Sequence, residues 1–216
     1  GAEPTSTPAP SPMSLPVATA TAIPTATPTP QPVWFLDVVE IDEELANEMT
    51  PTSWREGCPV GPDQLRLLTF PYVDFDAVVQ TGRMVVNAIH AADIGSVFGE
   101  FFAVGYPIQS IALVDGYGGA DGASMHANNT SAFNCRPVGT GSGAWSNHAF
   151  GAAIDLNPLM NLLVQGSFVD PAEGAEYLDR GDVRLGMIVG GDPAVAAFTR
   201  FGWIWGGTWS SLKDYQ

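Results

Sequence analysis

Two side chains able to bind a metal stand close together in the stretch SNHAFGAAIDLN, residues 146–157. His148 is followed seven residues later by Asp155, which sits between the apolar residues Ile154 and Leu156. Such an aspartate needs a partner, because burying an unpaired carboxylate is costly. Imidazole nitrogen and carboxylate oxygen are ordinary zinc ligands, but a catalytic zinc site uses three protein ligands. The pair therefore has two interpretations: part of a metal site, or a core histidine hydrogen-bonded to an aspartate.

The residues between the two side chains indicate how they would meet. If residues 151–157 form a strand, Ala153 and Asp155 share one of its faces. Gly151 can bend the chain so that His148 folds back toward the carboxylate. The small alanines leave room for a metal and a substrate.

The charge of the chain disfavours several classes of partner. Its 216 residues include 8 Lys and Arg against 23 Asp and Glu, a formal net charge of −15 at pH 7. Phosphate binding needs clustered cations, so no nucleic acid partner is expected, and an anionic membrane surface is disfavoured for the same reason. No apolar run is long enough to span a bilayer, so we expect no membrane insertion within this chain. We expect a monomer.

Residues 1–32 differ in composition from the rest, being rich in Pro, Thr, Ala and Ser. Such a segment cannot bury a core and favours extended conformations, so we predict a disordered linker followed by one domain over residues 33–216. A spacer of this kind is typical of exported proteins, although a plain disordered tail has the same composition. We therefore expect an exported protein.

The remaining sequence predicts a mixture of strands and helices. Residues 33–49 predict a strand and then a short helix, and residues 65–75 and 82–89 predict two strands joined by a turn at Thr81 and Gly82. Two helices are predicted, over residues 90–105, where apolar residues recur on one face, and over residues 192–202, where Asp192 precedes Pro193.

Further strands are predicted over residues 106–114, 151–157 and 203–209, with a long polar loop over residues 115–136. A loop of this length usually builds a site. The elements follow no regular βαβ repeat, so the expected fold class is α+β. Of the tryptophans Trp203, Trp205 and Trp209, at least two are expected in the core.

The stretch SNHAFGAAID fits the pattern Ser-x-His-x-x-Gly-x-Ala-x-Asp. This pattern resembles the zinc D-alanyl-D-alanine carboxypeptidase and L-alanyl-D-glutamate endopeptidase family of bacterial cell-wall peptidases. NNTSAFNCR at residues 128–136 and GWIWGGTWSSLKDYQ at residues 202–216 extend the resemblance, which covers approximately residues 58–216. It implies a compact domain with a small, mainly antiparallel sheet and packed helices, a fold also found in the Hedgehog signalling domain.

The resemblance assigns roles to five residues. It implies that His148 and Asp155 are Zn²⁺ ligands, that Arg136 binds the substrate and its developing oxyanion, and that Asp214 is the general base. Ser146 is expected to hydrogen-bond the substrate or orient His148, with a plain turn role equally open.

The third zinc ligand is expected immediately after Gln216, so that the domain would be truncated at its C-terminal edge. His126, in the predicted loop, is the main alternative within the chain, and His90 is another. Both histidines also have an ordinary interpretation as exposed or capping residues.

The implied function is zinc-dependent hydrolysis of peptide bonds in peptidoglycan stem peptides, with carboxypeptidase and endopeptidase activity both open. The alternative is a non-catalytic cell-wall or zinc-binding module of the same fold, and a weaker alternative is a structural domain in which His148 and Asp155 pair only with each other. The presence of both Arg136 and Asp214 favours the enzyme, because binding alone requires neither an oxyanion partner nor a base.

The chain has two cysteines, Cys58 and Cys135, which we predict to form a disulfide. The resemblance also implies an extracellular or cell-wall-associated bacterial protein, and an exported protein would keep such a bond. Because Cys135 directly precedes Arg136, the bond would fix the site loop to the start of the domain.

Overall fold

The computed structural model describes residues 1–2, 33–139 and 143–216. Contacts between Cα atoms divide the chain into residues 1–31 and 32–216, and the second unit contains the described helices and strands. The predicted linker over residues 1–32 lies outside the described residues, Gly1 and Ala2 excepted. Among the described helices, none has the length and apolar character that a membrane crossing requires.

Helices and short strands alternate irregularly along the second unit, which confirms the α+β class. The helices are α1 (Glu43–Met49), α2 (Ala91–Val104), α3 (Asp121–His126) and α4 (Pro193–Thr199). The strands are β1 (Asp37–Glu40), β2 (Leu65–Val73), β3 (Val79–Asn87), β4 (Ser110–Ile111), β5 (Asn129–Thr130), β6 (Leu163–Gln165), β7 (Phe168–Asp170) and β8 (Lys213–Asp214).

Three small sheets organise these strands. The largest is antiparallel with the order β1-β2-β3, and a second antiparallel sheet has the order β7-β6-β8. The short pair β4-β5 is parallel. The predicted mainly antiparallel strand pairing is thus confirmed, but the strands form three separate small sheets and not one.

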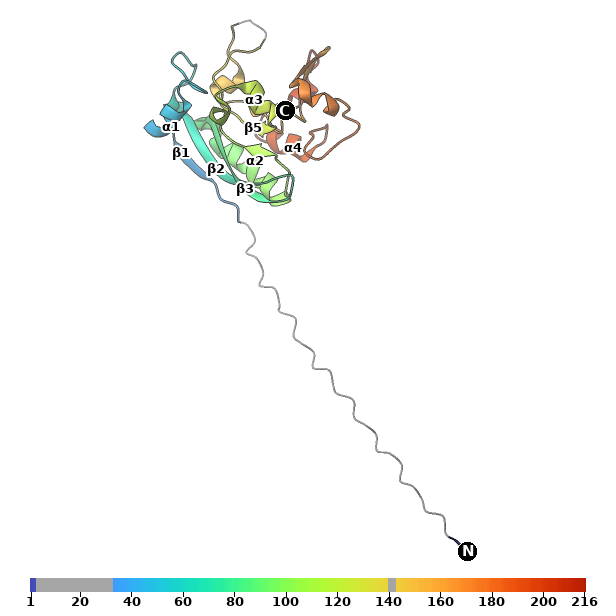
Figure 1. Cartoon of the computed structure of the whole chain (residues 1–216). Coiled ribbons are helices and arrows are strands. Elements are labelled where there is room, and N and C mark those ends of the chain that lie inside the picture. The colour runs from blue at the N-terminus through green and yellow to red at the C-terminus, as the bar shows by residue number, and fades with distance from the viewer. Residues whose placement is uncertain (3–32, 140–142) are drawn as a thin grey trace. The chain divides into compact units, whose positions relative to one another are not determined.

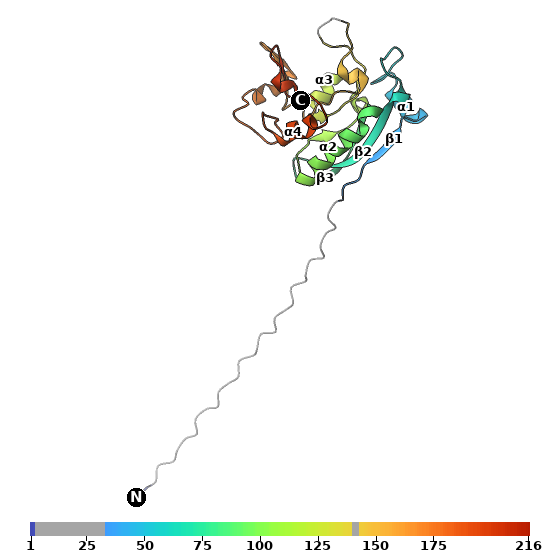
Figure 2. The same cartoon turned by 180° about the vertical axis from the view of Figure 1, so that it is seen from behind.

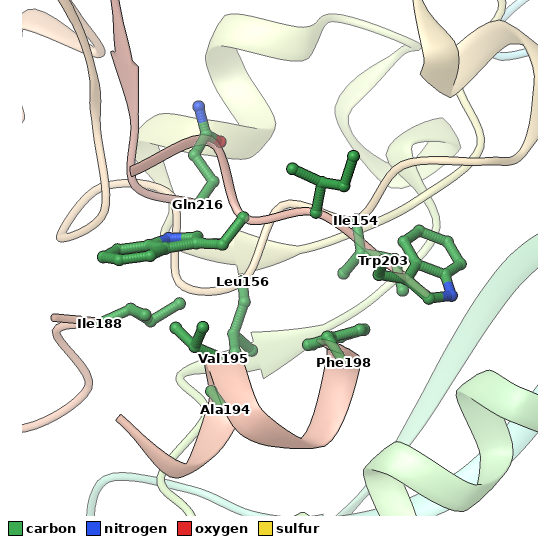
Figure 3. Close-up of a pocket in the computed structure, with 10 residues that line it drawn as sticks. Ile154, Leu156, Ile188, Ala194, Val195, Phe198, Trp203 and Gln216 are labelled. Atoms are coloured by element: carbon green, nitrogen blue, oxygen red, sulfur yellow. The ribbon is translucent and has the colours of Figure 1, made fainter. Parts of the chain in front are cut away.

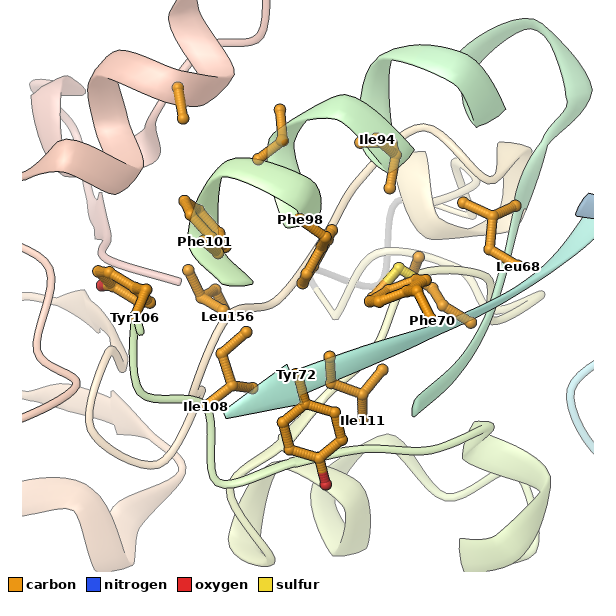
Figure 4. Packing of buried hydrophobic residues seen from close by; sticks show 14 of the residues in the cluster. Leu68, Phe70, Tyr72, Ile94, Phe98, Phe101, Tyr106, Ile108, Ile111 and Leu156 are labelled. Atoms are coloured by element: carbon orange, nitrogen blue, oxygen red, sulfur yellow. The ribbon is translucent and has the colours of Figure 1, made fainter. Parts of the chain in front are cut away.

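The largest sheet separates two apolar clusters, because side chains along a strand alternate between its faces. Leu68, Phe70 and Tyr72 of β2 belong to the cluster on the α2 side, shown in Figure 4. Leu65 and Leu67 of the same strand belong to the second cluster, which includes residues of α1. Figures 1 and 2 show α2 lying across one face of this sheet. The predicted helix α2 buries the expected face and ends at Gly105.

The turn between the two long strands is not where the sequence predicted it. Thr81 and Gly82 lie inside β3 and pair with β2. The chain reverses over residues 74–78 instead, where Oδ1 of Asp74 accepts backbone hydrogen bonds, including one of 2.8 Å from the N–H of Val78. The Asp74 carboxylate accepts hydrogen bonds from the backbone of its own turn, and this stabilises a turn here and not at the Thr-Gly pattern.

The other predicted strands and the predicted loop also need correction. Residues 106–114 contain only the two-residue β4, residues 151–157 form one isolated bridge and no strand, and residues 203–209 contain a 3₁₀ turn. Side-chain amides explain the first case: Oδ1 of Asn129 and Oδ1 of Asn157 accept backbone N–H groups that a strand partner would otherwise take. The predicted loop over residues 115–136 contains α3 and β5, so it is largely ordered into short elements.

Candidate active site

A 3₁₀ turn, η4 (Asn147–Phe150), carries His148, and the flanking residues fix its shape. Ser146 caps the turn, because its Oγ accepts a 3.3 Å hydrogen bond from the His148 N–H. Gly151 ends the turn at a φ of 63°, which favours glycine, and a Cβ there would lie 2.5 Å from the backbone N of Asn87. The Ser-x-His-x-x-Gly spacing is therefore that of a capped turn packed against the end of β3. The turn role of Ser146 is what the structure shows, and its contact with substrate stays a prediction.

The side chains of His148 and Asp155 lie next to each other and are nearly buried. Nε2 of His148 is 3.1 Å from Oδ1 of Asp155, with side-chain exposures of 9% and 8%. Asp155 is placed by its backbone bridge to Ser131, and Nδ1 of His148 lies 2.6 Å from the carbonyl oxygen of Ala132. Both side chains are thus held by the same segment, residues 131–132.

The contact with Ala132 determines which ring nitrogen of His148 carries a proton, and therefore how Nε2 can interact with Asp155. A carbonyl oxygen only accepts, so Nδ1 must carry a proton, and Nε2 then presents a lone pair to the carboxylate unless the ring is doubly protonated. Two facing acceptors need a cation, either a second ring proton or a metal. Burial by itself lowers the pKa of His148, but the charge of Asp155 and its hydrogen bond outweigh burial and raise it.

The same geometry suits a metal. Zinc bonds of about 2.0–2.2 Å at tetrahedral angles place two ligand atoms about 3.3–3.6 Å apart. The 3.1 Å between Nε2 of His148 and Oδ1 of Asp155 is close to that separation. The carbonyl of Ala132 fixes the ring from behind, as the outer partners of metal-bound histidines do.

Arg136 is brought to this site by the pairing of two flanking segments. The N–H of Ser146 donates to the carbonyl of Arg136 at 3.0 Å, and the N–H of Val138 donates to the carbonyl of Ala144 at 2.8 Å. Burial lowers the pKa of His148 most strongly, and the nearby positive charge of Arg136 acts in the same direction. The guanidinium forms an ion pair with Asp121, with 2.8 Å between Nη2 and Oδ2.

The predicted disulfide between Cys58 and Cys135 is present and lies immediately before Arg136. The Cys135 N–H also donates to the carbonyl of Ser53 at 2.8 Å. The segment leading into the arginine is therefore anchored by one covalent bond and one backbone hydrogen bond.

Asp214 lies on β8, opposite Leu163 of β6. Its backbone packs closely against Gly206, where an added Cβ would lie 2.6 Å from the Cβ of Asp214. Among the described residues, no hydrogen-bond partner reaches its buried Oδ1. Burial, followed by the charge of Asp155, raises the pKa of Asp214 to about 7. A carboxyl group that titrates near neutrality can accept a proton and return it.

His148, Asp155 and Asp214 open onto one cleft, whereas Arg136 and Ser146 are not among its described lining residues. It is lined by His148, Asp155, Asp214 and Gln216, by the small residues Ala152 and Ala153, and by His90, Asn147, Ile154, Phe201, Gly202, Trp203, Ile204, Gly206 and Trp209. An adjoining apolar pocket, lined in part by residues of α4, shares Ile154, Trp203, Ile204 and Gln216 with the cleft (Figure 3). The cleft therefore has a polar part at the histidine and an apolar wall.

The three tryptophans divide between the core and the cleft. Trp205 packs against the main apolar cluster and donates its Nε1–H to the carbonyl of Tyr215 at 3.1 Å. Trp203 packs against the same cluster and also lines the cleft, whereas Trp209 is 42% exposed on the cleft wall. The prediction of at least two core tryptophans is consistent with this arrangement.

The two alternative histidines have different positions. His126 is exposed, pairs with Glu173 at 3.3 Å and lines another pocket, so it is not near His148 in this structure. His90 lines the cleft, with its ring 5.1 Å from the ring of Trp203. Within the part of the chain that the structure describes, no group of three His, Cys, Asp or Glu side chains could hold a metal.

Sequence reasoning missed three contributors to the site. The Ala132 carbonyl has no side-chain signature, and Asp121 lay in a segment predicted to be a loop. Gly206 was visible as part of the GG pair within WGGTW, but its close approach to Asp214 depends on a sheet pairing that local pattern does not give.

One comparison with known proteins bears on this site. Residues 140–216 match the family model described as D-alanyl-D-alanine carboxypeptidase. The match includes His148, Asp155 and Asp214, and it supports a peptidase that acts on peptidoglycan; residues 33–139, with Arg136 among them, lie outside it. Neither a curated protein nor a solved structure matches the chain.

Proposed function

We propose that this protein is a zinc peptidase that hydrolyses a peptide bond in the stem peptides of bacterial peptidoglycan, as a D,D-carboxypeptidase or an L-alanyl-D-glutamate endopeptidase. The observation that carries the proposal is the close pair of Nε2 of His148 and Oδ1 of Asp155, which needs a cation, either a ring proton or a metal. They lie 3.1 Å apart in a cleft that also contains Asp214, whose pKa is near 7. A binding module does not need such an acid.

The described residues fit two of the three protein ligands of a catalytic zinc site. The family resemblance puts the third at the position following Gln216, and the side chain of Gln216 itself lines the cleft. A residue bonded to Gln216 would therefore start beside the two ligands. Zinc bound there would supply Lewis-acid polarisation of the scissile carbonyl.

The other residues of the site have separate roles in this proposal. Asp214 accepts a proton from the attacking water and returns it to the leaving amine, which its raised pKa permits. Arg136, whose charge is permanent, stabilises the oxyanion or holds a substrate carboxylate. Ser146 orients His148 through the capped turn.

We also propose that the protein works outside the cytoplasm of a bacterium. The disulfide between Cys58 and Cys135 supports this, because such bonds persist in oxidising compartments. Peptidoglycan, the proposed substrate, also lies outside the cytoplasm.

The test measures zinc content after dialysis and the products released from a stem peptide, for the chain ending at Gln216 and for the same chain extended by one histidine. The extended chain should retain zinc and release product. In that chain His148→Ala and Asp155→Ala should abolish zinc retention. Asp214→Ala should keep zinc and lower turnover by about 10²–10⁴-fold, since a base is not a ligand.

Each other outcome has a defined meaning. Zinc retention without turnover by the extended chain would support the non-catalytic module. Equal activity of both chains would put the third ligand within these 216 residues. No zinc retention by either chain would leave His148 and Asp155 as a structural pair. The identity of the released product, free D-alanine or a peptide, separates carboxypeptidase from endopeptidase.

A further inference from the structure

Asp121, the first residue of α3, is a carboxylate near the site to which the proposed reaction gives no role. We infer that Asp121 is a positioning residue that holds the guanidinium of Arg136 in its working orientation. This inference rests on the proposed function for the role of Arg136, but the orientation itself can be measured without any activity.

The contacts of Asp121 are directed at the segment that carries the arginine. Its Oδ2 lies 2.8 Å from Nη2 of Arg136, and its Oδ1 accepts a 3.4 Å hydrogen bond from Nδ2 of Asn134. Both carboxylate oxygens therefore contact residues two positions apart in the chain. The side chains of Asp121 and Arg136 are only 23% and 28% exposed, so water screens the pair less than it screens a surface ion pair.

The arginine still has donors to offer once this pair is formed. A guanidinium has five N–H donors, and Asp121 occupies one nitrogen. Nε of Arg136 is buried and has no hydrogen-bond partner among the described residues. The ion pair with Asp121 therefore uses only part of the donor capacity of the guanidinium, and the remaining N–H groups can serve an acceptor that arrives with a ligand.

Holding the side chain in advance has a kinetic advantage. An arginine loses rotamer entropy when it is fixed, and fixing it before substrate binds removes that cost from the reaction. The neighbouring negative charge also weakens the pull of Arg136 on an oxyanion. The two effects have opposite signs: removal of Asp121 lowers activity if positioning dominates and raises it if charge dominates. We infer that positioning dominates.

The first measurement uses the metal-free chain and reports only how rigidly the Arg136 side chain is held. The Arg136 Nε–H signal in a ¹⁵N–¹H spectrum is assigned by its loss in Arg136→Lys, and its heteronuclear NOE is compared between variants. We expect a value near that of the backbone in the wild type and a clearly lower value in Asp121→Ala. Asp170→Asn is the matched control, because Asp170 lies near enough to affect Arg136 electrostatically but forms no ion pair with it; this variant should leave the signal unchanged.

The second measurement is a double-mutant cycle on stem-peptide hydrolysis by the histidine-extended chain. Asp121→Ala should lower kcat/KM by about tenfold to a hundredfold in the wild-type background and by less than about threefold in the Arg136→Ala background. A merely structural role would lower kcat/KM equally in both backgrounds. An unchanged Nε–H signal in Asp121→Ala, or equal losses in the two backgrounds, would overturn the inference. If the wild type hydrolyses nothing, the proposed function fails, and the Nε–H signal alone decides the role of Asp121.

Discussion

At the scale of single residues, the site is defined by groups whose charges need a cation or a ligand for balance. Nδ1 of His148 is committed to the Ala132 carbonyl, so Nε2 meets the Asp155 carboxylate either with a second ring proton or with a bound metal between them. Asp214 is buried close enough for its pKa to respond to the charge of Asp155, and Oδ1 of Asp214 has no hydrogen-bond partner among the described residues. Such an arrangement lowers the stability of the metal-free protein, as expected of a functional site.

Asp214 should therefore reduce stability at neutral and alkaline pH. Its folded-state pKa, about 7, is raised above the ordinary aspartate pKa of about 3.9, so the folded protein holds this proton more tightly than the unfolded chain. The contribution of Asp214 to the unfolding free energy is greatest below about pH 4 and is lost as the pH rises through 7. With a chelator present, Asp214→Asn should unfold at higher urea concentration than wild type at pH 8. The difference should be on the order of a few kcal/mol, because one pKa unit corresponds to about 1.4 kcal/mol.

The comparison of variants isolates this group from others that titrate in the same range. At pH 4 the wild type and Asp214→Asn should have nearly equal unfolding free energies. Glu56→Gln, which removes an exposed carboxylate, should change little at either pH. Equal stability of Asp214→Asn and wild type at pH 8 would show that the carboxyl group is not destabilised by burial.

At the scale of elements, the η4 turn depends on one close approach of the backbone. Gly151→Ala should destabilise the fold, because the residue has a φ of 63° and a Cβ would lie 2.5 Å from the backbone N of Asn87. Gly166→Ala is the matched control, with a φ of 61° and nothing within 4 Å of its Cβ. Each substitution should lower the unfolding free energy by about 1–2 kcal/mol, because alanine is strained in the left-handed conformation.

The close approach should make the loss for Gly151→Ala larger by a further 1 kcal/mol or more, on the order expected for overpacking. Thermal or urea unfolding of both variants gives the comparison. Equal losses would indicate that β3 yields to the added methyl group without cost, and the motif glycine would then be explained by its φ alone.

The elements predicted from sequence are those whose pattern is local. α2 and α4 followed from apolar periodicity and from the Asp192-Pro193 start. The strand predicted over residues 151–157 failed because Asp155 is fixed by a single bridge to Ser131. The segment after it is held by Asn157, whose N–H donates to Oγ1 of Thr130 and whose Oδ1 accepts from the N–H of Gln109. Partners distant in sequence decide such segments, so local alternation does not predict them.

The site residues also divide into those predicted from local sequence and those whose positions depend on tertiary contacts. The spacing of His148 and Asp155, with the family resemblance, placed both side chains, and the structure brings them within contact distance of each other. The pairing of Asp214 with β6 and the ion pair of Arg136 with Asp121 depend on tertiary structure. They were not visible in the sequence.

At the scale of the whole domain, the Cys58–Cys135 bond joins two segments 77 residues apart within the second apolar cluster. Cys135 is fully buried there and its N–H is bonded to the Ser53 carbonyl, so its position does not depend on the disulfide alone. The bond should act mainly by restricting the unfolded chain, which for a loop of this length contributes about 4 kcal/mol in the chain-entropy model.

Replacing both Cys58 and Cys135 by alanine should therefore lower the unfolding free energy by about 4 kcal/mol. It should leave the site intact at temperatures where the variant remains folded, because the Ser53 hydrogen bond and the pairing of Arg136 with Ser146 still hold the segment. Urea unfolding measures the effect on stability, with reduced wild type as the matched control, since reduction opens the same loop without removing the sulfurs.

Stem-peptide hydrolysis by the histidine-extended chain at low temperature measures the effect on the site. We expect kcat/KM to change less than about threefold, since no contact of the guanidinium with Asp121 is removed. A large loss of activity in a fully folded variant would mean that the disulfide also sets the position of Arg136, and the site would then depend on the oxidation state of the protein.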